Sequence, residues 1–351
     1  MTSASHAGFT VPTIDVSGWI DGDDAELDHI ARAVDDACRT VGFMQVVGHG
    51  IGEHAVDGLT RAMDAFFAQP LDAKLALVPP RPSINRGYTA VKSERLSYSL
   101  GVDSPADLFE AFNVGASRDD FPHLDLEGDD YALNLWPAIE AVPAFQAGVE
   151  AWFGEVAAFA HRMTSILARA LDVDADFFES FTDHSIDVLR MVNYTLEPGT
   201  EIEPDQLGMG AHTDYGIVTV LWADPVPGLQ ILDHDGVWHD VTPAPGAVLI
   251  NLGDLLARWT NDRYVSTMHR VVPPVDAEGR SLPRRSAAFF HDGNADAVIS
   301  TIDSCRDDAG ETSYADVTVA EHLFQKLNGS RGLELNQHAA AEAARVTGAS
   351  S

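Results

Sequence analysis

Apolar residues recur at helical spacing through much of the first 180 residues of the chain. They lie three and four positions apart in Asp28–Thr40, in about Glu53–Phe67 and in about Ala138–Ala170, so each segment is predicted to be an amphipathic helix. Short apolar runs at 11–16 and Phe43–Val47 predict two strands among these helices. This part of the chain is therefore expected to be mainly helical.

The pattern changes after Ser185, where short β-rich runs follow one another between turn signals. Seven runs are expected to be strands: Asp187–Tyr194, Thr219–Trp222, Gly228–Leu232, Gly236–Val241, Ala247–Leu252, His269–Val272 and Arg285–His291. Short strands at even spacing are typical of a β-sandwich or barrel such as a jelly roll. We therefore expect a mainly β fold with flanking helices, in which a double-stranded β-helix (jelly roll) core is buttressed by N-terminal and central α-helices.

The helical part and the β-rich part are expected to form a single unit over 1–351, because a helical layer can support a β core without being a separate domain. The segment Pro79–Asp107 is rich in Pro, Ser, Gly and Arg and is predicted to be a long ordered loop. The expected regions are a mostly helical part at 9–180, a jelly-roll core with the functional site at 185–295, a C-terminal extension at 296–335 and a frayed tail at 336–351.

Composition and charge limit the partners of the protein. The net charge is −32, from 54 acidic against 22 basic residues, and such a surface repels phosphate backbones and anionic lipids. No apolar run approaches the length of a membrane span, and the first residues lack the features of a secretory signal. Only Cys38 and Cys305 are present, which fits a reducing, cytoplasmic setting. We expect a small-molecule substrate, no nucleic-acid or membrane partner, and a monomer or weak homo-oligomer.

An imidazole and a carboxylate lie two residues apart at the start of a strand-forming run. His212 and Asp214 of GAHTDYGIVTVL precede β-branched residues, so they are expected on a strand or at its entrance. Residues i and i+2 of a strand point to the same face, and both side chains would then converge on one point. This arrangement suggests a shared proton or a shared metal ion.

A third ligand would distinguish a metal site from packing. His234, His239, His269 and His291 follow in the sequence, and His269 is favoured because it opens the strand-like run HRVV after a polar turn region. Two imidazoles and one carboxylate form a facial triad with three open positions, which suits non-haem Fe(II) and oxygen chemistry. The sequence lacks the GxSxG turn that would support a Ser–His–Asp hydrolase. A closed structural zinc site would need a fourth ligand.

A carboxylate-binding pair is predicted in the segment PRRSAAFF. Arg284 and Ser286 are i and i+2 on an expected strand, so a guanidinium fork and a hydroxyl share one face. The guanidinium of such a pair can donate two parallel hydrogen bonds to a carboxylate, and the hydroxyl can donate a third. Arg285 points the other way and is interpreted as a surface residue.

With these motifs in place, the sequence resembles the isopenicillin N synthase-like family of Fe(II)/2-oxoglutarate-dependent dioxygenases. The resemblance covers nearly the whole chain. It rests on the motifs VPTIDVSGW, VGFMQVVGHGI, RGY, DLFEAFNVG, NLWP, HTDYGIVTVL, the run from GLQILDHDG to MHRVV, and RRSAAFF, all in the same order.

The resemblance implies specific roles for these residues. His212, Asp214 and His269 would be the catalytic metal ligands that bind Fe(II), and Arg284 with Ser286 would hold the distal carboxylate of the cosubstrate 2-oxoglutarate. Tyr194 would assist, although Thr195 departs from the family pattern, which leaves the roles of Asn193 and Tyr194 open by one position. With O2, the enzyme would oxidise an unactivated C–H bond of a small organic substrate and release succinate and CO2.

Two other readings of the function stay open at this point. One is an Fe(II) oxidase of the same fold that does not use 2-oxoglutarate, like isopenicillin N synthase or aminocyclopropane-carboxylate oxidase. The other is a non-catalytic jelly-roll protein that binds a metal or ligand. Hydroxylation, desaturation, ring closure and demethylation are all compatible with the motifs.

The substrate contacts are expected in the segments before the β core. Arg86 or Arg95 is predicted to meet an anionic or carbonyl group of the substrate, with Tyr88 and Phe112 as an apolar wall. The alternative is that Arg86 pairs with Glu110 and only holds the loop. Stability and kinetics of an Arg86→Ala variant would separate the two.

Overall fold

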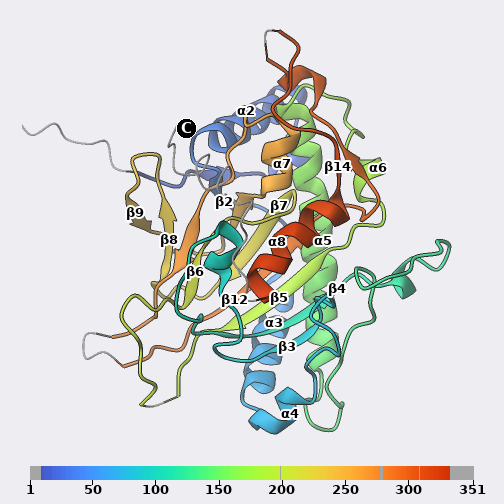
Figure 1. The fold of residues 1–351 in the computed structure, drawn as a ribbon. Coiled ribbons are helices and arrows are strands. Elements are labelled where there is room, and N and C mark those ends of the chain that lie inside the picture. The colour runs from blue at the N-terminus through green and yellow to red at the C-terminus, as the bar shows by residue number, and fades with distance from the viewer. Residues whose placement is uncertain (1–8, 198, 277–279, 308, 333–351) are drawn as a thin grey trace, which may run out of the picture.

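The computed structural model describes residues 9–197, 199–276, 280–307 and 309–332, and two β-sheets dominate it. Figure 1 shows the sheets with a long helix running along one side of the molecule. The expected mainly β fold with a jelly-roll core and flanking helices is confirmed by the sheets and by the solved structures that resemble this chain. The expected tail at 336–351 lies outside the described residues.

The major sheet has eight strands in the order β1-β2-β10-β7-β12-β5-β4-β3. Its strands are β1 (Thr13–Asp15), β2 (Phe43–Val47), β10 (Val248–Leu252), β7 (Val218–Ala223), β12 (Arg285–His291), β5 (Val188–Asn193), β4 (Glu110–Gly115) and β3 (Gly87–Thr89). The β1–β2 pair is parallel, and the other pairs of described strands in this sheet are antiparallel. The region expected to be mostly helical thus contributes four strands, β1 to β4, to this sheet.

The minor sheet has four strands in the order β6-β11-β8-β9. They are β6 (Met209–His212), β11 (His269–Val271), β8 (Leu229–Leu232) and β9 (Trp238–Asp240). Apolar side chains of both sheets pack in one buried cluster, which includes Val192 and Leu249 from the major sheet and Met209, Ile231 and Val271 from the minor sheet. The two sheets therefore face each other across this cluster, as the sheets of a jelly roll do.

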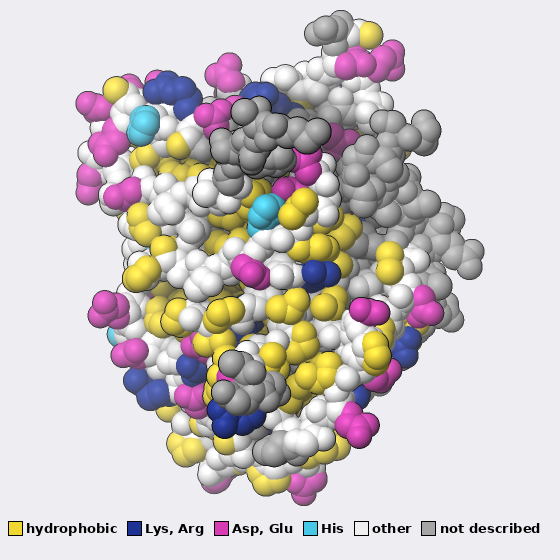
Figure 2. Space-filling model, turned by 90° about the vertical axis from the view of Figure 1, so that its left-hand side faces the viewer, with side chains coloured by type: hydrophobic (Ala, Val, Ile, Leu, Met, Phe, Trp, Pro, Cys, Tyr) yellow, Lys and Arg dark blue, Asp and Glu magenta, His cyan; other side chains and the backbone are white. Residues whose placement is uncertain are grey.

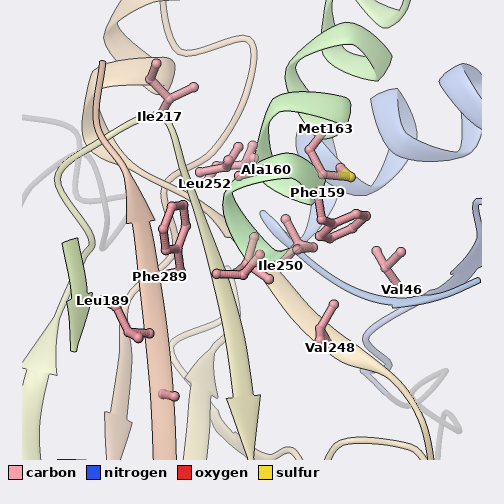
Figure 3. Close-up of a cluster of buried hydrophobic side chains, with 14 of the residues drawn as sticks. Val46, Phe159, Ala160, Met163, Leu189, Ile217, Val248, Ile250, Leu252 and Phe289 are labelled. Carbon is pink, nitrogen blue, oxygen red and sulfur yellow. The ribbon is translucent and has the colours of Figure 1, made fainter. Parts of the chain in front are cut away.

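Helices cover the opposite face of the major sheet. They include α2 (Asp24–Thr40), α3 (Glu53–Phe67) and the long α5 (Phe145–Ala170). Phe159, Ala160 and Met163 of α5 point toward Ile250 and Phe289 of the sheet in the larger hydrophobic cluster (Figure 3). The predicted helix at 53–67 and the strand at 43–47 match these bounds, whereas α5 begins at Phe145 rather than near Ala138.

The remaining elements are short, with one exception. They are α1 (Gly18–Asp21), α4 (Leu71–Leu75), η1 (Leu96–Leu100), η2 (Arg118–Asp120), α6 (Glu179–Thr182), α7 (Asp254–Trp259), β13 (Val298–Ile299), η3 (Asp303–Cys305), β14 (Val317–Thr318) and α8 (Val319–Gly332). The exception, α8, lies against η1 and crosses the front of the molecule in Figure 1. The predicted loop Pro79–Asp107 is largely irregular but contains β3 and η1.

Acidic and hydrophobic side chains occupy different parts of one side of the molecule. Figure 2 looks at the side of the molecule where β8 and β9 lie, and shows acidic side chains mostly around the rim with hydrophobic side chains across the middle. Among the helices of the described ranges, none combines the length and the apolar character that a bilayer crossing requires.

Candidate active site

Three ligand side chains converge at one end of the jelly roll. His212 is the last residue of β6, Asp214 follows in the turn toward β7, and His269 is the first residue of β11. His212 and His269 are directly opposite each other in the antiparallel β6–β11 pair. Asp214 Oδ1 lies 3.7 Å from His212 Nε2 and 3.6 Å from His269 Nε2. Within the described residues, this is the one group of three or more potential metal ligands whose ligand atoms approach one another closely.

Backbone carbonyls orient both imidazoles. His212 Nδ1 donates to the carbonyl oxygen of Gly210 at 2.7 Å, and His269 Nδ1 donates to that of Thr267 at 3.1 Å. A carbonyl can only accept, so each Nδ1 carries the proton and each Nε2 keeps its lone pair toward the centre. Burial, together with the nearby His269, lowers the pKa of His212 to about 4. The backbone hydrogen bonds therefore orient both rings so that each Nε2 faces the centre of the group, as in a metal site.

The carboxylate is held by two neighbouring strands of the major sheet. Asp214 Oδ2 accepts hydrogen bonds from Thr219 Oγ1 at 2.5 Å and from Asn251 Nδ2 at 2.6 Å. Thr219 on β7 and Asn251 on β10 are paired across the sheet, so they form a fixed cradle. Because Oδ2 is occupied, Oδ1 is the oxygen left to face the histidines.

This donor set fits Fe(II). Two neutral imidazole nitrogens and one carboxylate oxygen make a facial triad and leave positions open for other ligands. A closed structural zinc site would need a fourth residue, and the described residues bring none to this group. The other candidate histidines serve elsewhere: His239 bonds to Asp233, His291 bonds to Asp187, and His234 is exposed.

Arg284 is buried beside the minor sheet with unused hydrogen-bonding capacity. It is 2% exposed, and its Nη1 has no hydrogen-bond partner among the described residues. Its guanidinium carbon lies 4.8 Å from the centre of the Tyr194 ring. Burial raises the pKa of Tyr194, while Arg284 and a hydrogen bond with Ser286 act in the opposite direction. A buried guanidinium with a free donor, a hydroxyl and a phenol together fit the carboxylate of a small ligand.

Two neighbouring residues take other roles. Asn193 Nδ2 donates to Glu110 Oε1 at 2.9 Å. Because its amide is engaged there, Tyr194 is the better candidate for the residue that assists Arg284. Arg285 points away from Arg284, as expected, and forms ion pairs with Asp224 and Asp64 at 3.0 and 2.7 Å. It is a structural link to α3 rather than a plain surface residue.

A cavity of about 640 Å³ opens beside the triad. Its lining combines strand residues of the major sheet, the segments before β3 and the last helix. The residues are Pro82, Ser83, Asn85, Arg86, Glu94, Leu96, Asn113, Asp129, Asp130, Ile186, Val188, Arg190, His212, Asp214, Tyr215, Phe290, Asp292, Ala320, Glu321, Leu323, Phe324 and Leu327. Arg284, Ser286 and Tyr194 are not in this lining, so the predicted carboxylate-binding residues lie outside the cavity wall.

The predicted substrate residues are only partly at this cavity. Arg86 lines it, but its Nη2 donates to the backbone oxygens of Ala116 and Asp130 at 2.6 and 3.1 Å, and it does not pair with Glu110. Glu110 instead accepts from Lys74 and Tyr88, each at 2.6 Å.

The expected apolar wall is wrong. Tyr88 and Phe112 are opposite each other in the β3–β4 pair, and their side chains pack in the larger hydrophobic cluster with Phe66, on the helical side of the sheet. Arg95 bonds to the Tyr98 hydroxyl at 2.6 Å and is not in the cavity lining. The actual walls include Phe290 and residues of α8.

Sequence reasoning missed a buried ion pair that lines the cavity, between a residue of β5 and one in the segment before η1. Arg190 Nη2 and Glu94 Oε2 form a 2.6 Å ion pair in which both side chains are 9% exposed. Arg190 interrupts the otherwise apolar run VLRMV of a central strand. A charged residue in such a run is rarely buried without a partner, and that signal was available in the sequence.

The last helix is anchored to the metal-binding turn. Lys326 Nζ and Asp254 Oδ2 are 2.7 Å apart, and the same Oδ2 accepts from Thr213 Oγ1, between the two ligands of the turn. His322 Nε2 donates to the carbonyl oxygen of Tyr215 at 3.1 Å. Leu323 and Leu327 of this helix line the cavity. The contacts that hold α8 over the cavity are therefore the same contacts that hold the turn between His212 and β7.

Comparisons with known families agree with this geometry. The model of the 2OG-Fe(II) oxygenase superfamily matches residues 186–293, which contain the triad, Arg284 and Ser286. A second model, the N-terminal region of the non-haem dioxygenase in morphine synthesis, matches residues 11–139.

Individual proteins resemble nearly the whole chain. A 2-oxoglutarate-Fe(II) type oxidoreductase from Emericella nidulans is 33% identical over 92% of this chain and 90% of its own. A homoarginine-6-hydroxylase from Oryza sativa is 31% identical over 90% of this chain and 96% of its own. A solved Neurospora crassa protein in complex with alpha-KG superposes with a TM-score of 0.81 at 30% identity, covering 92% of this chain and 97% of its own. It has also been solved with thymine and with 5-formyluracil.

Proposed function

Because the chain belongs to the 2OG-Fe(II) oxygenase superfamily, we propose that it oxidises an unactivated C–H bond of a small organic molecule bound in the cavity beside the triad. It is an Fe(II)- and 2-oxoglutarate-dependent dioxygenase. The outcome would be hydroxylation, desaturation or cyclisation, which differ in how the substrate lies relative to the iron. The observation that carries the proposal is the cavity of about 640 Å³, which reaches His212 and Asp214 directly.

In this proposal the protein residues bind and orient, and bound Fe(II) would supply the oxidation chemistry, in which O2 is the oxidant and the oxidative decarboxylation of 2-oxoglutarate to succinate and CO2 is coupled to oxidation of the substrate. His212, Asp214 and His269 hold Fe(II). Arg284 would direct Nη1, which has no hydrogen-bond partner among the described residues, at the distal carboxylate of 2-oxoglutarate, and Ser286 would add a hydroxyl. Tyr194 positions the guanidinium from 4.8 Å. The burial of all three supports this assignment, because a desolvated charged hydrogen bond is stronger than an exposed one.

The similar proteins support a small substrate without fixing its identity. The rice relative is named for homoarginine, and the Neurospora crassa protein was crystallised with thymine and 5-formyluracil. These molecules differ in charge and shape, so they do not define one substrate class for this chain. Arg86 remains a candidate contact at the cavity wall, with its guanidinium partly occupied by backbone oxygens.

We further propose that the enzyme works in a reducing, cytoplasmic compartment without nucleic-acid or membrane partners, as a monomer or weak homo-oligomer. The net charge of −32 supports the absence of polyanionic partners. Cys38 and Cys305 are both free and buried, which suits a reducing compartment.

The test is a mass-spectrometric substrate screen that follows succinate release with Fe(II), O2 and 2-oxoglutarate. We expect one or more small molecules to increase succinate production and to gain or lose mass in step with it. Oxygen consumption with a substrate but without 2-oxoglutarate would instead support the Fe(II) oxidase alternative. Binding without any turnover across the screen would support the non-catalytic alternative.

A further inference from the structure

Two residues that line the cavity carry a donor and an acceptor to which no described residue is hydrogen-bonded. Asn113 on β4 and Arg190 on β5 are directly opposite each other, so their side chains leave the sheet side by side on one face. Both line the cavity. Arg190 Nε and Asn113 Oδ1 are buried, and neither has a hydrogen-bond partner among the described residues.

The other polar atoms of these side chains fix their orientation. Arg190 Nη2 is held by Glu94 Oε2 at 2.6 Å, and Asn113 Nδ2 donates to Asn85 Oδ1 at 2.7 Å. The Arg190 guanidinium also lies 5.0 Å from the centre of the Phe109 ring. A buried polar atom without a partner destabilises the folded state, so it is usually retained where a ligand or another group completes it. The pair therefore presents one N–H donor and one carbonyl acceptor in fixed positions.

The charges around the pair favour a neutral ligand. Glu94 already balances the charge of Arg190, so an added carboxylate would gain little from the guanidinium and would meet the acidic residues Asp129 and Glu321 of the same lining. A cationic ligand would be repelled by the Arg190 guanidinium and by Fe(II) bound at the triad. Val188 shares a face with Arg190, and Phe290, opposite Val188, extends that face as an apolar wall.

We propose that the cavity binds a neutral substrate that carries an acceptor and a donor on adjoining atoms, as a lactam, a cyclic imide or a pyrimidinone does. The carbonyl of the substrate accepts from Arg190, and its N–H donates to Asn113 Oδ1. Phe290 contacts the ring or chain that carries this group. The inference rests on the proposed function for the position of the substrate, and it adds the chemical class.

Binding can be measured without turnover. Anaerobic protein loaded with Fe(II) and 2-oxoglutarate is titrated in a calorimeter with four six-membered-ring probes: 2-piperidone, cyclohexanone, cyclohexanecarboxylate and piperidine. We expect 2-piperidone to bind roughly tenfold or more tightly than cyclohexanone, because only the lactam satisfies both atoms. The anionic and the cationic probe are expected to bind more weakly than either neutral probe.

Variants assign the effect to the pair. Arg190→Lys keeps the charge beside Glu94 but removes the Nε donor, and Asn113→Leu removes the acceptor; each is expected to abolish the preference for 2-piperidone over cyclohexanone. Glu94→Gln removes the balancing charge and should increase affinity for cyclohexanecarboxylate. Arg285→Lys is the matched control, because Arg285 is an ion-paired strand arginine outside the cavity lining. Melting temperatures and 2-oxoglutarate affinity show that each variant is folded.

Equal binding of lactam and ketone, tighter binding of a charged probe, or an unchanged preference in folded Arg190→Lys and Asn113→Leu protein would overturn the inference. The proposed function is judged separately by succinate release. Lactam selectivity without any substrate-dependent succinate would refute the function and leave the inference standing. Turnover of a charged substrate by a protein that does not bind lactams would refute the inference and leave the proposed function standing.

Discussion

The anchor between α8 and the metal-binding turn leads to a quantitative prediction for Lys326→Met. The ammonium of Lys326 and the carboxylate of Asp254 are 2.7 Å apart, with side chains only 3% and 1% exposed. Methionine preserves most of the apolar stem but removes the charge. Asp254 then stays buried and keeps the hydrogen bond from Thr213, but it loses the ion pair with Lys326.

Breaking a buried ion pair from one side typically costs about 3–5 kcal/mol. With an unfolding entropy of about 2.1 cal/mol/K per residue over 351 residues, 1 kcal/mol corresponds to about 1.4 °C. The melting temperature is therefore expected to fall by about 4–7 °C if α8 stays docked. If α8 detaches first, the fall is smaller, and amide hydrogen exchange in 319–327 rises instead.

The assay combines thermal melting, hydrogen exchange by mass spectrometry and turnover. The double variant Lys326→Met/Asp254→Asn removes the stranded charge while an Asn oxygen still accepts from Thr213, and it should recover most of the loss. Lys92→Met, at an exposed position, is the control for loss of one positive charge. A Lys326→Met protein with unchanged melting and unchanged exchange in α8 would refute the role of this pair as the anchor.

The remaining predictions concern the metal, the cosubstrate and pH. His269→Ala should abolish turnover and sharply weaken Fe(II) binding in calorimetry while the protein stays folded; wild-type turnover would show that the third ligand is misassigned. Asn251→Ala, which removes one of the two donors to the carboxylate ligand, should weaken Fe(II) binding about 10- to 100-fold. Arg284→Gln should raise the KM for 2-oxoglutarate roughly ten- to hundredfold, whereas Arg285→Gln should lower the melting temperature instead; equal effects on KM would contradict the strand register. Burial raises the pKa of Asp107 to about 7, so the folded state keeps a proton that the unfolded state loses above about pH 4. Stability should thus fall by about 4 kcal/mol between pH 4 and 7, and Asp107→Asn should flatten this dependence in denaturant titrations.

The sequence was sufficient for the iron triad because its geometry is local. His212 and Asp214 are two residues apart, and His269 needed only the expectation that its strand lies beside theirs. Arg284 and Ser286 followed from the same alternation within one strand.

The cavity lining could not be predicted in the same way. It depends on which residues of each strand point to which face of the sheet, and these strands pair with partners far away in the sequence. Tyr88 and Phe112 face the helices, while Asn113, one residue further along β4, lines the cavity. A shift by one residue exchanges the two faces of a strand, and nothing in the sequence near 86–113 fixes that choice. The contribution of α8 depends on contacts with Asp254 and Tyr215, far away in the sequence.

The position of the three ligands gives the metal ion a mechanical consequence. His212 and His269 belong to the minor sheet, whereas the Asp214 carboxylate is fastened to Thr219 and Asn251 of the major sheet. A bound ion is therefore a cross-link between the two sheets at the open end of the jelly roll. Because an ion that binds only the folded chain stabilises it by RT ln(1 + [M]/Kd), or about 2.7 kcal/mol at a hundredfold excess over Kd, iron supply would also raise the free energy of unfolding of the enzyme.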